Sequence, residues 1–155
     1  MSSLYESYNY DVSYRAIVNS NNVVKVFTER DCIEVNSQIS FDIEDSSKTS
    51  FNYFTSSIIS GIIHNLIFVS KKSNIKLEDI EGKIKIKLKN PLTVLAVNGY
   101  TEEAKIDSCE ITIYLFSDLE DDELMDFCKK SLNSCFIYNT LKDVMDINIK
   151  FIPIL

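Results

Sequence analysis

The chain has 155 residues, of which 45% are hydrophobic and 25% charged, and this balance is typical of a folded protein. Its length predicts a single domain, residues 1–155, around one hydrophobic core. The net charge of −7 and the low arginine content argue against a nucleic-acid-binding surface, which requires clustered basic side chains.

Extended segments open the chain. Residues 8–18 alternate between apolar and polar side chains, which predicts a strand with one buried face. A second extended segment follows the polar turn at residues 19–22. A third follows the polar turn at residues 28–31 and ends near residue 39. This pattern predicts an antiparallel meander of three strands.

A long apolar helix is predicted over residues 52–72, because apolar side chains recur there at helical spacing. A second apolar set, Ile59, Ile63 and Ile67, makes the middle of this helix apolar nearly all round. Such a helix is expected to be buried on every side. A single domain of this size has too little surface of its own to cover the whole helix. The pattern therefore predicts a homodimer that buries the helix between subunits. The most apolar segment, residues 57–70, is shorter than a membrane span, so no membrane anchor is expected.

Strand patterns return in the second half. Residues 83–88 and 109–116 alternate, and Asn98–Gly99 predicts a tight hairpin turn between them. Residues 117–120, SDLE, predict a capping box that opens a second helix, and residues 147–153 close the chain as a strand. The order β-β-β-α-β-β-α-β predicts an α+β fold in which antiparallel sheets pack on the buried central helix and on the second helix.

The chain has four cysteines, and we expect them to be reduced. The N-terminal residues do not have the pattern of a secretory signal, which predicts a cytoplasmic protein. No CxxC pair occurs, and the one histidine does not complete a zinc site of familiar spacing, so neither a metal nor another cofactor is expected. Cys135 is predicted to share a helical face with Cys128, near a helix C-terminus where the dipole disfavours an anion. A buried structural role is therefore one interpretation of Cys135.

The element order and the segment CFIYNTL, residues 135–141, resemble the OsmC/Ohr family of osmotically inducible and organic hydroperoxide resistance proteins. Many members of that family are intertwined homodimers, and many reduce hydroperoxides with two cysteines. The resemblance implies that Cys135 corresponds to the resolving cysteine, although Phe136 replaces the usual proline. It also implies that the peroxidatic cysteine of the central helix corresponds to Gly61, which has no thiol, and the activating glutamate has no clear counterpart.

Three polar residues complete the predicted site. His64 lies within a helical turn of Gly61, where it is either a donor in a pocket or a histidine hydrogen-bonded within a helix pair. Asn65 is a polar residue in an apolar helix and is expected to need hydrogen-bond partners. Asn139 belongs to the segment that matches the family pattern and is a further candidate for the pocket.

The sequence leaves two functions open. In the favoured one, the protein is a member of the peroxide-stress family without efficient two-cysteine peroxidase activity, and its dimer-interface pocket binds a small apolar ligand or a partner. In the alternative, it is a thiol-dependent hydroperoxide reductase that uses Cys135 as a single redox cysteine and an external thiol for recycling. The nearest candidate for a second thiol is Cys128, which a continuous helix would place about 10 Å from Cys135, too far for a disulfide.

Overall fold

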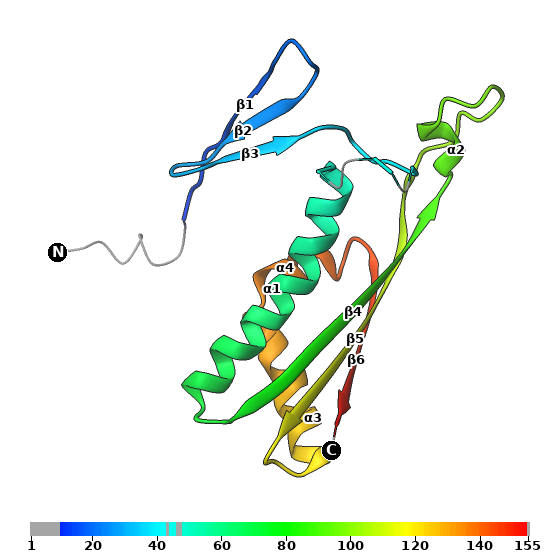
Figure 1. Cartoon of the computed structure of the whole chain (residues 1–155). Helices are drawn as coiled ribbons and strands as arrows, with labels where there is room; N and C mark the ends of the chain where they lie inside the picture. The colour runs from blue at the N-terminus through cyan, green and yellow to red at the C-terminus, as the bar shows by residue number, and fades with distance from the viewer. Residues whose placement is uncertain (1–9, 43, 46–47, 155) are drawn as a thin grey trace. The chain divides into compact units, whose positions relative to one another are not determined.

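The computed structural model describes residues 10–42, 44–45 and 48–154. These residues form an α+β fold with two three-stranded sheets, and the predicted fold class is therefore confirmed (Figure 1). The chain groups into two compact units, Met1–Phe54 and Thr55–Leu155. The long helix α1, Ser50–Lys72, begins in the first unit and provides the first element of the second.

The C-terminal unit is built on a mixed sheet with the strand order β4-β5-β6. Strands β4 (Leu77–Lys89) and β5 (Lys105–Ser117) are antiparallel, whereas β5 and β6 (Asp146–Pro153) are parallel. The prediction of purely antiparallel sheets is wrong at this second pair. Parallel neighbours need a crossover connection, and the helices that lie between β5 and β6 in the chain supply it.

Three helical segments form this connection, where the sequence predicted one helix. They are α3 (Asp121–Ser131), the 3-10 turn η2 (Leu132–Ser134) and α4 (Phe136–Leu141). Cys135 stands between η2 and α4 with φ −84° and ψ 98°, and it is the N-cap residue of α4. The prediction that Cys135 lies at the C-terminal end of a continuous helix is therefore wrong.

The predicted capping box at residues 117–120 is also not formed. Ser117 remains in β5, where it pairs with Leu77, and its Oγ accepts a hydrogen bond from the amide of Leu119 at 3.3 Å. Helix α3 instead begins at Asp121, with Glu120 as its N-cap residue. The sheet register, which depends on a strand distant in sequence, overrides the local helix signal.

Residues 90–104 connect β4 to β5 through an ordered loop, not through the predicted two-residue turn. The loop contains the short helix α2 (Pro91–Val94). Two side chains link its arms: Asn90 Nδ2 donates to the backbone oxygen of Glu103 at 2.8 Å, and Thr93 Oγ1 donates to that of Glu102 at 2.7 Å. Gly99 does adopt the positive φ, 89°, that its turn signal predicts, but within this longer connection.

The core of the C-terminal unit lies between one face of the sheet and the helices. Helices α1 and α3 cover the same face, because their buried side chains meet the inward-facing residues of β5 (Figure 1). The buried residues that form it include Ile58, Ile62 and Leu66 of α1, Ile111, Ile113 and Leu115 of β5, and Leu124 and Cys128 of α3. Gly82 of β4 permits the close approach of α1, since an added Cβ would lie 2.8 Å from the Cδ1 atoms of both Ile59 and Ile63.

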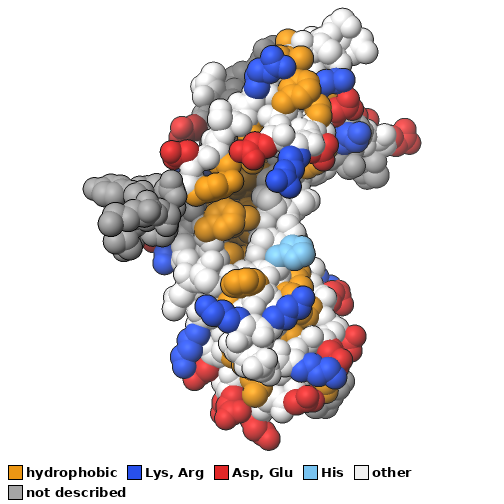
Figure 2. All heavy atoms as spheres, turned by 90° about the vertical axis from the view of Figure 1, so that its left-hand side faces the viewer, with side chains coloured by type: hydrophobic (Ala, Val, Ile, Leu, Met, Phe, Trp, Pro, Cys, Tyr) orange, Lys and Arg blue, Asp and Glu red, His pale blue; other side chains and the backbone are white. Residues whose placement is uncertain are grey.

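A single chain covers only one face of α1. Its fully buried residues recur every four positions, as a helix with one inward stripe requires. In contrast, Phe68 is 65% exposed, and Ile63 is only partly buried. Figure 2 shows hydrophobic side chains exposed on the face of the molecule that also carries the histidine. Burial of this helix on every side is therefore not achieved within one chain.

Helix α1 is longer than its apolar segment. With 23 residues, it is the one helix in the described part of the chain that is long and apolar enough to cross a membrane. The apolar segment of residues 57–70 is one part of this helix, and the length of the whole helix is by itself weak evidence for a membrane span. Core helices of globular proteins pass the same test, and the stripe of α1 that packs on β5 is the arrangement of a core helix.

The N-terminal unit contains the predicted antiparallel meander. Its strands are β1 (Arg15–Val18), β2 (Val24–Phe27) and β3 (Cys32–Val35), in the order β1-β2-β3. The first strand is shorter than predicted, because residues 10–14 are not paired in the sheet, and its predicted buried face is wrong, since all four residues of β1 are exposed. Residues 8 and 9 of that prediction lie outside the described part of the chain.

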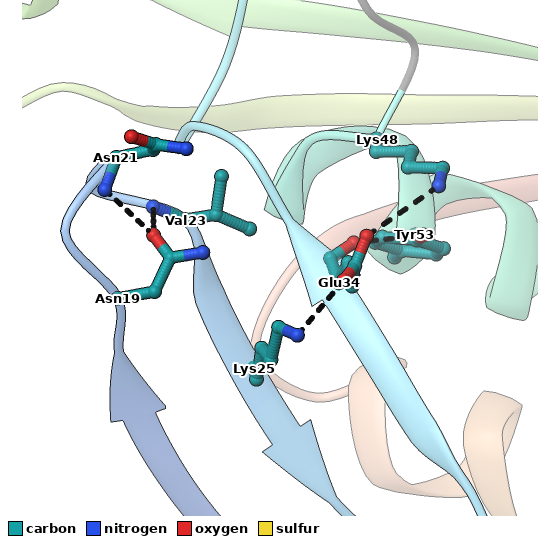
Figure 3. Close-up of polar contacts among 7 residues, drawn as sticks. All are labelled: Asn19, Asn21, Val23, Lys25, Glu34, Lys48 and Tyr53. Carbon is teal, nitrogen blue, oxygen red and sulfur yellow. Dashed lines mark hydrogen bonds and ion pairs between the residues drawn. The ribbon is translucent and has the colours of Figure 1, made fainter.

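Side-chain hydrogen bonds fix the turns of this unit (Figure 3). Asn19 Oδ1 accepts from the amides of Asn21 and Val23 at 2.9 and 3.0 Å, which closes the predicted turn between β1 and β2. The Tyr53 hydroxyl donates to the backbone oxygen of Glu34 at 3.0 Å and joins β3 to the first turn of α1. The polar turn residues therefore act as the sequence pattern predicts.

Candidate functional site

A pocket of about 270 Å³ opens in the C-terminal unit between α1 and the segment that joins η2 to α4. One wall consists of Gly61, His64, Asn65 and Phe68, and the other consists of Ser134, Cys135, Phe136 and Ile137. Four of the five residues predicted for the site, Gly61, His64, Asn65 and Cys135, therefore lie together. The fifth, Asn139, does not line the pocket.

The local structure of each wall explains which side chains it presents. On α1 the lining residues have relative spacings of three, four and seven, which place them on one face of a helix. The opposite wall uses four consecutive residues, 134–137, because the chain there leaves η2, passes through the extended residue Cys135 and enters α4. A continuous helix would not present four consecutive side chains to one pocket.

Asn65 joins the two walls. Its Nδ2 donates to the backbone oxygen of Ser131 at 2.7 Å, and its Oδ1 accepts from Ser134 Oγ at 2.8 Å. The prediction that this polar residue needs partners in an apolar helix is confirmed. The two bonds hold α1 against the last residue of α3 and the last residue of η2, so Asn65 supports the shape of the pocket.

Asn139 supports the second wall from behind. Its Nδ2 donates to the backbone oxygens of Leu132 and Asn133 at 3.1 and 3.0 Å. These carbonyls belong to η2, where the helical hydrogen bonding of α3 has ended and oxygens need other donors. Asn139 therefore stabilises the turn before Cys135, and its predicted place among the pocket residues is not observed.

Ile137 takes up the space next to Gly61. A Cβ added to Gly61 would lie 2.6 Å from Ile137 Cδ1, 3.5 Å from Cγ1 and 3.7 Å from Cβ. The first distance is shorter than van der Waals contact, and the other two are normal contacts. Gly61 thus presents bare backbone to the pocket, and an isoleucine from the opposite wall fills the space beside it.

His64 is exposed and lines the pocket on its solvent side (Figure 2). The imidazole is therefore accessible both to water and to a molecule bound in the pocket. No group of three or more histidine, cysteine or acidic side chains in the described residues is arranged to hold a metal ion.

The four cysteines are free, and they lie in different surroundings. Cys32 is exposed, whereas Cys135 is only 3% exposed and lines the pocket. Burial raises the pKa of Cys109, and it raises the pKa of Cys128 to about 12. Cys128 is therefore protonated at neutral pH, and a protonated thiol is a poor nucleophile for disulfide exchange.

The structure includes pocket residues that the sequence did not single out. Phe68 lies seven positions after Gly61, so its helical spacing was a usable signal. Ile137 and Ser134 had no such signal, because their positions depend on the break between α3 and α4. That break is visible only in the folded chain.

The arrangement of sheet and helices is that of OsmC-like proteins. The chain is similar to an OsmC-like protein from Mycoplasma pneumoniae, with a TM-score of 0.74, 11% identity and coverage of 95% of this chain and 99% of that one. It is also similar to an organic hydroperoxide resistance protein from Elizabethkingia anophelis, with a TM-score of 0.67, 14% identity and coverage of 99% and 100%. For the organic hydroperoxide resistance protein OhrB of Bacillus subtilis the TM-score is 0.57, the identity 11% and the coverage 92% and 98%. At these identities the likeness establishes the fold.

The sequence itself places the chain in a family. Residues 43–150 match the family model described as OsmC-like protein. This match spans more than half of the chain, and the protein belongs to the OsmC-like family, as the resemblance of its sequence implied. No curated protein sequence matches the chain significantly.

Proposed function

We propose that this OsmC-like protein binds a small, uncharged, apolar molecule in the pocket between Gly61 and Cys135 and lacks efficient two-cysteine peroxidase activity. The observation that carries the proposal is the pair formed by Gly61 and Ile137. The helix position that resembles the peroxidatic cysteine has no thiol, and the space for a side chain there is filled by Ile137 Cδ1, 2.6 Å from the position of a Cβ. Cys128 does not supply a reactive second thiol for Cys135, because burial raises the pKa of Cys128 to about 12 and keeps it protonated.

The chemistry of the lining supports an apolar ligand. Gly61, Phe68, Phe136 and Ile137 provide hydrocarbon surface, and none of the lining side chains is an acid, a lysine or an arginine. The volume of about 270 Å³ lies between a 150 Å³ cavity that holds benzene and the roughly 300 Å³ of the smallest drug-sized sites. A charged ligand would have no fixed counter-charge in this lining.

Peroxide consumption tests this proposal. The reduced protein, mixed with cumene hydroperoxide or hydrogen peroxide and either dithiothreitol or a lipoylated reductant, is expected to turn over no faster than a generic exposed thiol. No intramolecular disulfide is expected in the mass spectrum after oxidation. Cys32→Ser is the matched control, because it removes the exposed thiol and should abolish most of any slow consumption.

The alternative function uses Cys135 alone, and its place in the pocket wall supports it. The Cys135 sulfur would attack the peroxide, the O–O bond would break and an alcohol would leave, with a sulfenic acid formed on the protein. One external thiol would then release water and form a mixed disulfide, and a second would regenerate Cys135. Rapid turnover that is abolished by Cys135→Ser, but not by Cys32→Ser, would establish this alternative and contradict our proposal.

We also propose that the protein is a cytoplasmic homodimer and that residues 1–155 constitute one OsmC-like domain. The structural relative from Mycoplasma pneumoniae supports the single domain, since 95% of this chain and 99% of that one are covered. The open face of α1 supports the dimer: Phe68 is 65% exposed, and apolar surface of this kind favours a partner. A second copy of the chain would cover that face, and the four free cysteines fit a reducing compartment.

Sedimentation velocity at micromolar concentration tests the dimer. The wild type is expected to sediment as a dimer, and Phe68→Glu as a monomer, because a buried carboxylate without a partner opposes association. Ile152→Glu is the control, because this exposed residue follows the buried Phe151 in β6 and so lies on the opposite face of the sheet. A monomeric wild type would contradict the proposal.

A further inference from the structure

We infer that Ile137 sets the depth of the pocket and thereby limits the length of the uncharged alkyl ligand that the pocket accepts. This inference rests on the proposed ligand-binding function. It assigns the control of specificity to a residue in α4 that faces Gly61 from the opposite wall.

The contact between the two walls involves one methyl group. Of the atoms next to the position of a Cβ on Gly61, only Ile137 Cδ1, at 2.6 Å, is closer than a normal contact. Cγ1 and Cβ of Ile137 follow at 3.5 and 3.7 Å. Removing Cδ1 would therefore open a space above the bare backbone of Gly61, of a size that suits about one carbon atom. Removing Cγ1 as well would extend that space.

The other lining residues indicate how a ligand would lie. In the single chain Phe68 and Phe136 are 65% and 79% exposed, and they form the apolar open side of the pocket, which the second copy of the proposed dimer would border. His64 is exposed beside them and can meet a polar end group at the solvent side. Asn65 and Ser134 already bond to one another at 2.8 Å, so the interior offers mainly hydrocarbon to a ligand. A primary alkanol has the matching form, with an alkyl chain for the interior and a hydroxyl for the entrance.

Titration with primary alkanols from butanol to octanol tests the inference in the full-length protein. Dissociation constants are measured from the shifts of the backbone amide NMR signals of Phe68 and Phe136. The wild type is expected to gain affinity with chain length up to a limit, beyond which further methylenes stay in water. Ile137→Val should extend that limit by about one methylene and Ile137→Ala by more, with a gain of about fourfold for each methylene newly buried.

Ile149→Val is the matched control, because it removes the same methyl group from a partly buried residue of β6 that packs on the core and does not line the pocket. Its alkanol preference should equal that of the wild type. If the wild type binds alkanols and the limit is unchanged in Ile137→Val and Ile137→Ala, the inference is overturned while the ligand-binding function stands. If no alkanol binds to any of these proteins, both are overturned. Ile137→Val deletes a single methyl group and keeps the test available should Ile137→Ala not fold.

Discussion

A Gly61→Cys variant is expected to be less stable than the wild type by about 1 to 3 kcal/mol, because it overpacks the contact between α1 and α4. The new Cβ would lie 2.6 Å from Ile137 Cδ1. This atom is the end of a side chain, and its rotation should keep the loss in the lower half of that range. In an Ile137→Val background the same substitution should be neutral or stabilising, because Cδ1 is absent and glycine in a helix interior is about 1 kcal/mol less favourable than alanine.

Urea denaturation of the four proteins in this double-mutant cycle measures the coupling, which is expected to be favourable by about 1 kcal/mol or more. Gly82→Ala is the matched control. An added Cβ at Gly82 would meet Ile59 and Ile63, each at 2.8 Å, so Ile137→Val should not relieve it. Additive effects of Gly61→Cys and Ile137→Val would show that Ile137 does not occupy the place of the missing side chain.

The Gly61→Cys, Ile137→Val protein should also change its chemistry. Its introduced thiol would share a pocket with Cys135, which is 3% exposed and lines the opposite wall. Mass spectrometry after peroxide treatment is expected to detect a disulfide between the introduced thiol and Cys135, which the wild type cannot form. Turnover should remain slow, because no lysine or arginine lines the pocket to lower the pKa of the thiol.

Asn65→Leu is expected to lower the free energy of unfolding by about 1 to 3 kcal/mol, because it removes both bonds that join the pocket walls. The carbonyl of Ser131 would lose its donor at 2.7 Å, and Ser134 Oγ would lose one of its two acceptors, Asn65 Oδ1 at 2.8 Å, while the contact between Ser134 Oγ and the Ser131 oxygen at 3.0 Å would remain. Urea denaturation measures the loss. Asn148→Leu, at an exposed position of β6, is the control and should change stability by less than about 0.5 kcal/mol.

The Ser134→Ala variant separates the two bonds of Asn65. Adding it to Asn65→Leu should cost about 1 kcal/mol more, because the Ser134 hydroxyl still donates to the Ser131 oxygen at 3.0 Å and Ser134→Ala removes that remaining bond. A loss in Asn65→Leu no larger than that in Asn148→Leu would mean that the bonds to the η2 turn do not stabilise the fold. The wall containing Cys135 would then be held by its apolar contacts and by the hydrogen bonds of Asn139.

The sequence predicted those parts of the fold that depend on neighbouring residues. The meander and its polar turns follow from alternation and turn residues, and α1 follows from a helical period that its packing on β5 confirms. Gly61, His64 and Asn65 were placed together because they lie on one helix. Cys135 was added through the family resemblance, and the structure brings it into the same pocket.

The sequence patterns did not predict the local structure correctly where contacts with distant residues decide it. Helix α3 ends at Ser131, where Asn65, 66 residues earlier in the chain, bonds to the backbone. This break gives Cys135 an N-cap position and turns Ile137 toward Gly61, and no local signal marks it. In the same way, pairing with Leu77 keeps Ser117 in a strand despite its capping-box pattern.

The bond between Asn65 and Ser131 also shows that the pocket is present in the folded state and absent from the unfolded state. Its two walls come from segments separated by 66 residues, so they meet only in the folded chain. An occupant of the pocket therefore binds the native state alone, and at one hundred times its dissociation constant it would add about 2.7 kcal/mol to the free energy of unfolding. A rise in melting temperature is then a signal common to all such molecules. The natural ligand can be sought in a library of metabolites by this rise, before anything is known of its chemistry.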